Sequence, residues 1–570
     1  MGFYKPENKD YILQIIRNAN IAYVSMEIGL KKDVHTYSGG LGILAGDTLY
    51  SSADLELPVV GITLIHHKGY FRQDIIEGRQ QEEPEPWDID AYTIALPEGK
   101  TCLQLQGRTV HILPRVGIIV GERRHIVPIL FLDVAVEENH EHDRGYTDRL
   151  YDGDSRMRAI QEAILGIGGK RVLRALNCRN IHTLHMNEGH AAFAPLEDVR
   201  YLGKYYGFNK PKIHELVKSG HVFTTHTPVP AGHDRFDYGM LRELFSEEDF
   251  AWESIDLAGH YECNMTYLAL NLSRYCNAVA KKHGEVSRNM FPGYTIDSIT
   301  NGVHLPTWTH TAIQQLLDTH LPSWRVEPGI LKHAYKVLPH NELRAAHAQA
   351  KHDLLAFVKE KTGRELSPDV LTVGFARRFA PYKRADLLFT DIERLRSIAQ
   401  QKIQFIFAGE AHPRDEAGKD ILAKVIRYTQ ELQGDIEIVF IPDYNIECGQ
   451  KMTQGCDLWL NNPIPPKEAS GTSGMKATAN AVPNLSTLDG WWIEGITKDP
   501  LAGWIIEHRE DERDEISLYE QLERITHIYY DQPERWSEHM VHALSLAHYF
   551  NTHRMVQEYE TKAWTRRIYN

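Results

Sequence analysis

Short apolar runs that alternate with amphipathic helical segments constrain this chain most, and they predict an α/β fold. In the second half, residues 370–376, 404–409 and 436–441 are short and apolar, and the segments between them have helical periodicity. Strands joined by helical crossovers pair in parallel, so we expect a parallel sheet. Residues 21–26 (IAYVSM), a glycine turn and a helical run over 43–53 open the first half in the same manner.

A domain boundary is expected near residues 300–335. Turn signals fill residues 298–306, and a long helical segment begins at Leu343. With 570 residues the chain is long enough for more than one core. We therefore predict two Rossmann-like lobes, residues 1–310 and 311–570, that face each other across a cleft. Inside the first lobe, Asp154–Leu176 is expected to be a helix with an apolar core face.

Polar residues follow two predicted strands of the first lobe. Asn187, Glu188 and His190 come after one strand, and His226 comes after the next. Ligands of open α/β sheets gather at the carboxyl ends of strands, which makes these four residues site candidates. For His226, a hydrogen-bonded core histidine is the competing interpretation. The histidine spacings do not fit two ligands on one helical face, so we expect no bound metal.

A local cluster of cations stands out in an otherwise acidic chain. The net charge is -14, which argues against nucleic acid or an anionic membrane surface as the main partner. Arg377, Arg378, Lys383 and Arg384 nevertheless follow a predicted strand directly. Arginine binds phosphate through two parallel hydrogen bonds and lysine acts as a point charge, so we favour a phosphate site over a solvated charged face.

Two glycine-containing turns can bind an anion. Residues 470–474 (SGTSG) lead into a helix-forming run that carries Lys476, where a helix would expose free backbone N–H groups. An ordinary capped helix is the alternative there. The turn at Gly39, Gly40 and Leu41 can likewise present N–H groups to an anion or a sugar, or it can serve only for tight packing.

The cysteine pattern and the lack of a recognisable targeting segment lead us to expect a cytoplasmic protein. The six cysteines are scattered without a CxxC pair, as expected of reduced thiols. The N-terminus lacks the apolar core of a signal peptide, and no run reaches the roughly 20 apolar residues of a membrane helix. We therefore expect neither a disulfide framework nor a membrane span.

At this point several motifs resemble one family. Residues 468–490 (EASGTSGMKATANAVPNLSTLDG) are similar to the pyridoxal-phosphate signature of the α-glucan (glycogen, starch and maltodextrin) phosphorylases. SMEIGL, GGLGILAGD, NEGH, FTTHTPVP, TNGV, ARRFAPYKR and PDYN extend the resemblance over nearly the whole chain, which looks most like the short bacterial and archaeal members. The fold implied is the two-lobed GT-B glycosyltransferase architecture, with the C-terminal helix packing back on the first lobe.

The resemblance implies a role for each matched residue. Lys476 matches the lysine that holds pyridoxal 5'-phosphate as a Schiff base. The other cofactor positions are Thr472, Ser473, Arg377, Tyr444 and Trp308. The catalytic positions are Arg378 and Lys383 on substrate phosphate, with His226 and Glu468 on the glucosyl unit. The remaining substrate positions are Gly40, Leu41, Asn301, Ser470, Gly471, Glu188 and His190.

The activity implied is retaining phosphorolysis of an α-1,4-glucan by inorganic phosphate to give glucose 1-phosphate. Two alternatives remain: a nucleotide-sugar glucosyltransferase of the glycogen synthase type, against which Lys476 argues, and a glucan-binding relative without turnover. The family's usual homodimer is a further expectation. With about 20 residues before the predicted first strand, we expect no regulatory phosphorylation tail. Ser473-Gly474, Arg377 and Glu188-Gly189 depart from the family pattern, which bears on substrate fit more than on activity.

Overall fold

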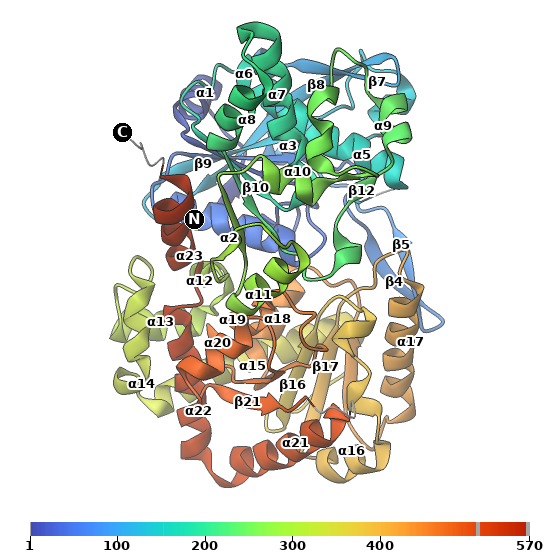
Figure 1. The fold of residues 1–570 in the computed structure, drawn as a ribbon. Coiled ribbons are helices and arrows are strands. Elements are labelled where there is room, and N and C mark those ends of the chain that lie inside the picture. The colour runs from blue at the N-terminus through green and yellow to red at the C-terminus, as the bar shows by residue number, and fades with distance from the viewer. Residues whose placement is uncertain (1, 152, 509–512, 566–570) are drawn as a thin grey trace.

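The structure is a computed structural model that describes residues 2–151, 153–508 and 513–565. Its two large sheets come from different halves of the chain, and Figure 1 shows the blue-to-green half above the yellow-to-red half. The mixed α/β class predicted from the sequence is confirmed. The outermost residues of the two predicted domains, Met1 and 566–570, lie outside the described residues.

The first sheet contains the predicted strand at residues 21–26 in its centre. The order β9-β3-β2-β10-β11-β14-β15 is parallel, and β8 pairs antiparallel with β9, β1, β6 and β7. Its strands are β1 (Gly2–Tyr4), β2 (Ile21–Ser25), β3 (Val59–Leu64), β6 (Ile94–Ala95), β7 (Thr101–Leu105), β8 (Arg108–Val120), β9 (Ile126–Asp133), β10 (Thr183–Asn187), β11 (His221–Thr224), β14 (Tyr275–Ala278) and β15 (Asp297–Ser298). The expectation that about 20 residues precede the first strand is wrong, because β1 lies before it and pairs with β8.

The second sheet is parallel throughout, in the order β18-β17-β16-β19-β20-β21. Its strands are β16 (Leu371–Ala376), β17 (Ile403–Ala408), β18 (Ile438–Ile441), β19 (Leu458–Asn461), β20 (Asn484–Thr487) and β21 (Gly503–Ile506). The three predicted strands are confirmed as β16, β17 and β18, and three more extend the sheet. The first half also carries two small antiparallel pairs, β4 (Arg72–Ile76) with β5 (Arg79–Glu83) and β12 (Arg235–Phe236) with β13 (Cys263–Asn264).

Helices fill the crossovers between parallel strands, as the alternating pattern predicts. Those of the first half are α1 (Lys9–Asn18), α2 (Gly40–Asp54), α3 (Ile89–Tyr92), α4 (Glu141–Arg144), α5 (Ser155–Ala163), α6 (Gly169–Ala175), α7 (Phe193–Tyr206), α8 (Lys210–Ser219), α9 (Tyr238–Leu244), α10 (Met265–Asn271) and α11 (Lys281–Met290). Between the sheets come α12 (Leu305–Trp308), α13 (Thr311–His320), α14 (Ala334–Val337) and α15 (His340–Thr362). The second half adds α16 (Ile392–Ala399), α17 (Glu416–Glu431), α18 (Ile446–Gly455), α19 (Thr472–Thr478), α20 (Trp491–Lys498), α21 (Asp514–Asp531), α22 (Pro533–Ser545) and α23 (Thr552–Tyr559).

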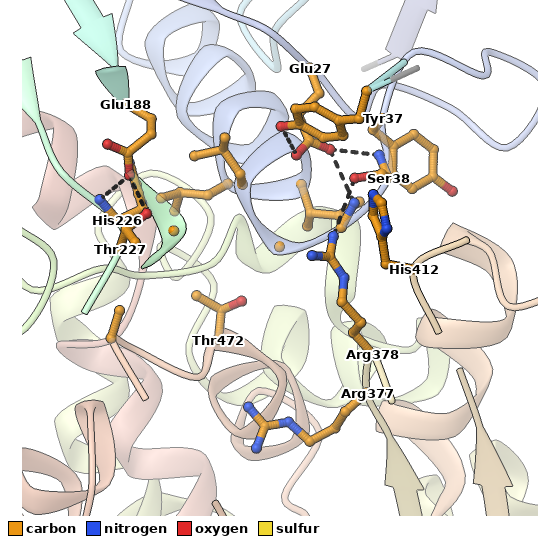
Figure 2. A pocket seen from close by; sticks show the side chains of 18 of the residues that line it. Glu27, Tyr37, Ser38, Glu188, His226, Thr227, Arg377, Arg378, His412 and Thr472 are labelled. Atoms are coloured by element: carbon orange, nitrogen blue, oxygen red, sulfur yellow. Dashed lines mark hydrogen bonds between the residues drawn. The ribbon is translucent and has the colours of Figure 1, made fainter. Parts of the chain in front are cut away.

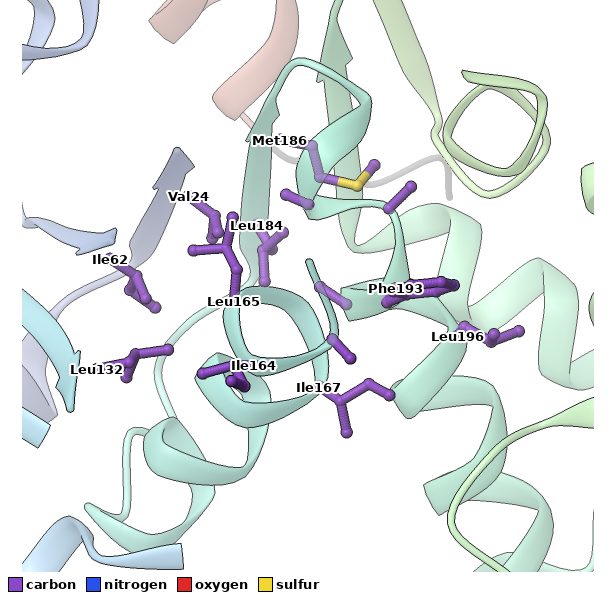
Figure 3. Close-up of a cluster of buried hydrophobic side chains, with 14 of the residues drawn as sticks. Val24, Ile62, Leu132, Ile164, Leu165, Ile167, Leu184, Met186, Phe193 and Leu196 are labelled. Carbon is purple, nitrogen blue, oxygen red and sulfur yellow. The ribbon is translucent and has the colours of Figure 1, made fainter. Parts of the chain in front are cut away.

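The predicted helix at Asp154–Leu176 forms as α5, a π-helical turn over Ile164–Gly168, and α6. Asp154 caps it by accepting the N–H groups of Arg156 and Met157. Figure 3 shows Ile164, Leu165 and Ile167 of the π turn packed among side chains of the neighbouring strands and of α7. The expected apolar core face of this helix is confirmed there. Met157, in the first turns of α5, is partly exposed.

Two segments cross between the halves. The β4–β5 hairpin lies against α17. Gln80 of this hairpin donates to the carbonyl of Ala411, in the loop before α17, at 2.9 Å. At the other end of the chain, α23 packs beside α2, as Figure 1 shows. The two halves are thus connected by contacts between segments that are far apart in sequence. No helix within the described ranges is both long enough and apolar enough to cross a membrane.

Candidate active site

One pocket of about 780 Å³ is lined by residues from both halves of the chain. Strand ends of the first sheet, the start of α2, the loop after β16 and the turn before α19 all reach it. Every residue to which the family resemblance assigns a role lines this pocket: Gly40, Leu41, Glu188, His190, His226, Asn301, Trp308, Arg377, Arg378, Lys383, Tyr444, Glu468, Ser470, Gly471, Thr472, Ser473 and Lys476. Two further candidates do not line it: Asn187 lies behind His226, and Arg384 pairs with Asp514. The fold therefore brings together motifs that are hundreds of residues apart.

Glu468 joins two of the predicted cations. Its Oε2 lies 2.5 Å from Arg377 Nη2 and 3.0 Å from Lys383 Nζ. Burial alone would raise the pKa of this carboxyl, but Arg377 and Lys383 outweigh burial and hold it at about 2. Its backbone N–H donates to the carboxylate of Asp489 at 2.8 Å. Glu468 is therefore a fixed, ionised carboxylate at neutral pH.

Arg378 lies on the opposite side of the cation cluster, beside the glycine loop. Its Nη2 is 3.4 Å from Ser38 Oγ, and Figure 2 shows Arg378 extending toward Ser38 while Arg377 points away from it. Glu27 accepts the N–H groups of Ser38 at 2.6 Å and Gly39 at 3.1 Å. The N–H of Gly39 is thus already occupied, so the predicted anion-facing N–H groups can only be those that follow it. Gly40 and Leu41 begin α2, where helix geometry provides no earlier carbonyl as acceptor.

Lys476 projects into the pocket from α19, against an aromatic wall. Its Nζ lies 3.6 Å from the centroid of the Trp308 ring. Burial lowers the pKa of Lys476 to about 8, which increases the fraction of uncharged, nucleophilic amine near neutral pH. Gly471 is the N-cap of α19, with a φ of 86° and no side chain to satisfy the free N–H groups of the first turn. The anion-binding interpretation of this turn stays a prediction.

His226 is held on two sides and still borders the pocket. Its backbone N–H donates to Glu188 at 2.7 Å, and its Nε2 lies 2.6 Å from Asn187 Oδ1. The amide of Asn187 also donates to Ser25, so the Nε2 of His226 is the donor. Burial lowers the pKa of His226 to about 4, which leaves Nδ1 unprotonated as an acceptor at neutral pH. His226 is hydrogen-bonded, as the core-histidine interpretation expects, and it also lines the pocket. The two interpretations are therefore compatible.

Four buried polar atoms of residues that line the pocket have no partner in the described part of the chain. They are Asn301 Oδ1, Ser470 Oγ, Arg377 Nη1 and His190 Nδ1. Buried polar groups are satisfied in most proteins, and an unsatisfied one at a pocket indicates a ligand. The first two suit sugar hydroxyls, and the guanidinium nitrogen suits an anion.

A group with metal-ligand chemistry lies at the pocket edge. One ligand atom each of Glu162, His190 and Asp234 lies within 4.8 Å of the others. Arg158 Nη2 stands 2.5 Å from Asp234 Oδ2 and 3.8 Å from Glu162 Oε1. The guanidinium already supplies the positive charge that a metal ion would bring, so the absence of a metal stays our prediction.

Several pocket residues were not predicted. Glu27 follows the end of β2 and Glu410 follows the end of β17, so the strand-end rule that selected Glu188 could have found both. Asp234 lies in a proline-rich loop with no such signal. Arg158 lies next to the apolar face of α5, where periodicity indicates core rather than chemistry.

Comparisons with known proteins agree with this geometry. The model of the family described as "Carbohydrate phosphorylase" matches residues 25–120 and 246–498. This chain belongs to the carbohydrate phosphorylase family. A maltodextrin phosphorylase of Thermococcus litoralis is 37% identical over 96% of this chain and 71% of its own length. Glycogen phosphorylases of Mycobacterium tuberculosis and Aquifex aeolicus are 36% and 34% identical, over 95% and 96% of this chain and 70% and 86% of their own lengths.

Some of the pocket residues of this phosphorylase lie inside the match to the family model, and others lie outside it. Lys476, Glu468, Arg378 and Lys383 fall inside the family model. Glu188, His190 and His226 fall outside it, within the longer alignments to the relatives. The family assignment makes the chain a glycosyltransferase-type enzyme.

Proposed function

We propose that this phosphorylase is an α-1,4-glucan phosphorylase that transfers the non-reducing-end glucosyl unit of a maltodextrin or glycogen chain to inorganic phosphate. The observation that carries the proposal is the convergence of Arg378, Lys383 and Lys476 with unsatisfied sugar-type polar atoms in one pocket. The relatives' names, maltodextrin and glycogen phosphorylase, agree with it.

We propose further that the two sheets form GT-B-like lobes, residues 1–310 and 311–570, with the pocket as their interlobe cleft. Separate hydrophobic clusters support this division, since one is built almost wholly around the first sheet and another around the second. The lining residues come from both parts. The return of α23 to α2 supports the predicted packing of the C-terminal helix on the first lobe.

The residues around Lys476 fit pyridoxal 5'-phosphate. Lys476 would attach the cofactor, with Trp308 and Tyr444 beside it and Thr472, Ser473 and the free Nη1 of Arg377 available for its phosphate. The lowered pKa of Lys476 favours that attachment. When bound, the cofactor supplies a phosphate group that exchanges a proton with the substrate phosphate.

The cations explain why phosphate is the acceptor. Arg378 and Lys383, with the N–H groups of Gly40 and Leu41, would hold inorganic phosphate, and they offset the repulsion between two neighbouring phosphates. Lobe closure would keep water from competing for the glucosyl unit. The remaining wall would bind the sugar: Asn301, Ser470, Gly471, His226, Glu188 and His190.

Glu468 is unsuited to the acid and nucleophile roles of a glycosidase. Its pKa of about 2 leaves no proton to donate at neutral pH, and two cations hold both of its oxygens. A retaining hydrolase needs an acid and a free carboxylate about 5–5.5 Å apart. We propose instead that the proton for the leaving oxygen comes from phosphate, as the family resemblance implies, and that Glu468 orients the sugar and the cations.

The test is incubation of the full chain with maltodextrin and phosphate, and in parallel with maltodextrin and UDP-glucose or ADP-glucose. Glucose 1-phosphate in the first mixture and no chain extension in the second is the expected outcome. Extension only with a nucleotide sugar would identify a synthase-type transferase. Glucan binding without turnover in either mixture would identify a relative without activity.

A further inference from the structure

Asp47 lies in the middle of α2 and faces the lysine site from the first half of the chain. It is seven residues after Gly40, two helical turns, and so lies on the same side of α2 as the start of the glycine loop. Its carboxylate is buried and accepts the indole N–H of Trp308, at 3.0 Å to Oδ1 and 2.9 Å to Oδ2. It is the last residue of the GGLGILAGD motif, but the resemblance assigns it no role.

The indole that Asp47 holds is the wall on which Lys476 lies. Lys476 Nζ is 3.6 Å from the ring centroid. The backbone of Trp308 is linked to α19, the helix that carries Lys476. Asn480 Nδ2 donates to the carbonyls of both Trp308 and Lys476 at 2.9 Å. Asn480 therefore fixes the backbone of Trp308, and Asp47 fixes its ring.

Few charged groups surround this pair. Asp47 on α2 is the charge that acts on Lys476, while Lys476 and His304 act on Asp47. His304 is itself engaged by Asp54 at 2.8 Å. Burial raises the pKa of Asp47 and lowers that of Lys476 to about 8, and each charge opposes the shift of the other. A buried carboxylate is costly unless it is compensated, and here the compensation comes from the indole N–H and the ammonium.

We propose that Asp47 is a positioning residue of the Lys476 site, which orients the Trp308 ring and supplies the buried counter-charge to the ammonium group. This assignment rests on the proposed function, in which Lys476 holds the cofactor. It gives α2 two roles, since its first turn faces the substrate phosphate and its third faces the lysine. Asp47 acts through Trp308 and is absent from the pocket lining itself.

The experiment measures the pH dependence of Lys476 acetylation, by peptide mass spectrometry, on the full chain after removal of any bound cofactor. Asp47→Asn keeps an oxygen acceptor for the indole and removes the charge. We expect its labelling midpoint to move to lower pH; a shift of about one pH unit makes Lys476 about fivefold faster to modify at pH 7. Glu56→Gln is the control, because it removes an exposed carboxylate just after α2 that lies 3.9 Å from Arg123, and it should leave the midpoint unchanged.

A midpoint equal to that of the wild type in Asp47→Asn would overturn the proposal. Asp47→Ser, which is smaller and also keeps an oxygen, gives the same measurement if the asparagine variant does not fold. In the cofactor-loaded enzyme, Asp47→Asn should lower kcat at least tenfold with the KM for phosphate unchanged. If the wild type makes no glucose 1-phosphate, the proposed function fails, whereas the labelling result still tests Asp47.

Discussion

Charge balance around Glu468 decides what single residues can do in this pocket. Arg377 and Lys383 share one carboxylate, while Arg378 faces the glycine loop. The cluster therefore offers cations in two directions, one toward the turn before α19 and one toward the start of α2. This arrangement suits two phosphates better than one.

Lys383→Ala tests the substrate side of this arrangement. Removal of one positioned cation should lower kcat/KM for phosphate about 10²- to 10³-fold, because it stabilises charge on the transferring groups. The free energy of unfolding should fall by only about 1 kcal/mol, since Arg377 still pairs with Glu468. Initial rates and urea unfolding measure both quantities. Lys467→Ala, an exposed neighbour outside the pocket lining, is the control, and equal rates in the two variants would remove Lys383 from the site.

Glu468→Gln tests the buried ion pairs through pH. The folded-state pKa is about 2 against an ordinary value of 4.5, so the ionised carboxylate contributes about 3 kcal/mol of stability above pH 4.5. That contribution is lost as the pH falls from 4.5 to 2. The stability difference between wild type and variant should therefore narrow over this range in chemical unfolding curves. A difference that stays constant from pH 7 to pH 3 would contradict the assigned pairing.

Single residues could be predicted from the sequence where a motif or a strand end marked them. Lys476 and Glu468 belong to one continuous stretch, and His226 follows a strand. Asp47 lies in the GGLGILAGD motif, but its role and that of Asp234 could not be predicted, because their partners, Trp308 and Arg158, are distant in sequence. Their roles depend on contacts that only the folded chain creates.

At the scale of elements, the packing of α19 accounts for Gly474, one of the residues that depart from the family pattern. A Cβ at Gly474 would lie 2.4 Å from Asn484 Oδ1 and 2.8 Å from Trp491 Cζ2. The space beside the helix is already filled, and Asn484 donates to the carbonyl of Gly474. Glycine at this position lets α19 pack closely on β20 and α20.

Gly474→Ala should therefore destabilise the protein. Overpacking at a filled site costs about 1–3 kcal/mol, which thermal unfolding detects as a lower Tm. Gly203→Ala in α7 is the matched control: its Cβ would meet its nearest neighbour at 3.6 Å, and alanine is the better helix former. The control should keep or raise Tm. A Gly474→Ala protein as stable as the wild type would show that the packing around α19 is looser than described.

Elements with clear periodicity were predictable, and others were not. The parallel strands β16, β17 and β18 and helix α15 follow directly from apolar patterning. Strands β19, β20 and β21 were not predicted; they are four residues each, as is the predicted β18, so length alone does not separate the missed strands from the predicted ones. The short β1 owes its conformation to pairing with β8, which is a tertiary contact.

For the whole molecule, the C-terminal segment joins the two halves behind the site. Trp564 Nε1 donates to His185 Nδ1 at 3.0 Å, and His185 Nε2 lies 2.8 Å from Thr224 Oγ1. These strands, β10 and β11, end at Asn187 and Thr224, and His226 lies two residues beyond β11. The last described residues of the chain thus support the strands that lead to the proposed sugar-binding wall. The homodimer expected from the family stays a prediction.

Trp564→Ala should lower the free energy of unfolding by about 3–5 kcal/mol, because a fully buried indole is lost. Trp564→Phe keeps most of the ring and loses only the N–H to His185, so its loss should be smaller. Urea unfolding of both variants provides the comparison. Stability losses below 1 kcal/mol in both would show that the C-terminal segment does not support the first sheet.

The central claim is that phosphate, rather than water or a nucleotide sugar, is the partner of the glucosyl unit. The most direct measurement is ³¹P NMR of the wild-type chain with maltodextrin and inorganic phosphate, with free glucose assayed in the same samples. We predict that the inorganic phosphate signal declines as that of α-glucose 1-phosphate grows, and that no free glucose accumulates. Release of free glucose with the phosphate signal unchanged would contradict the account.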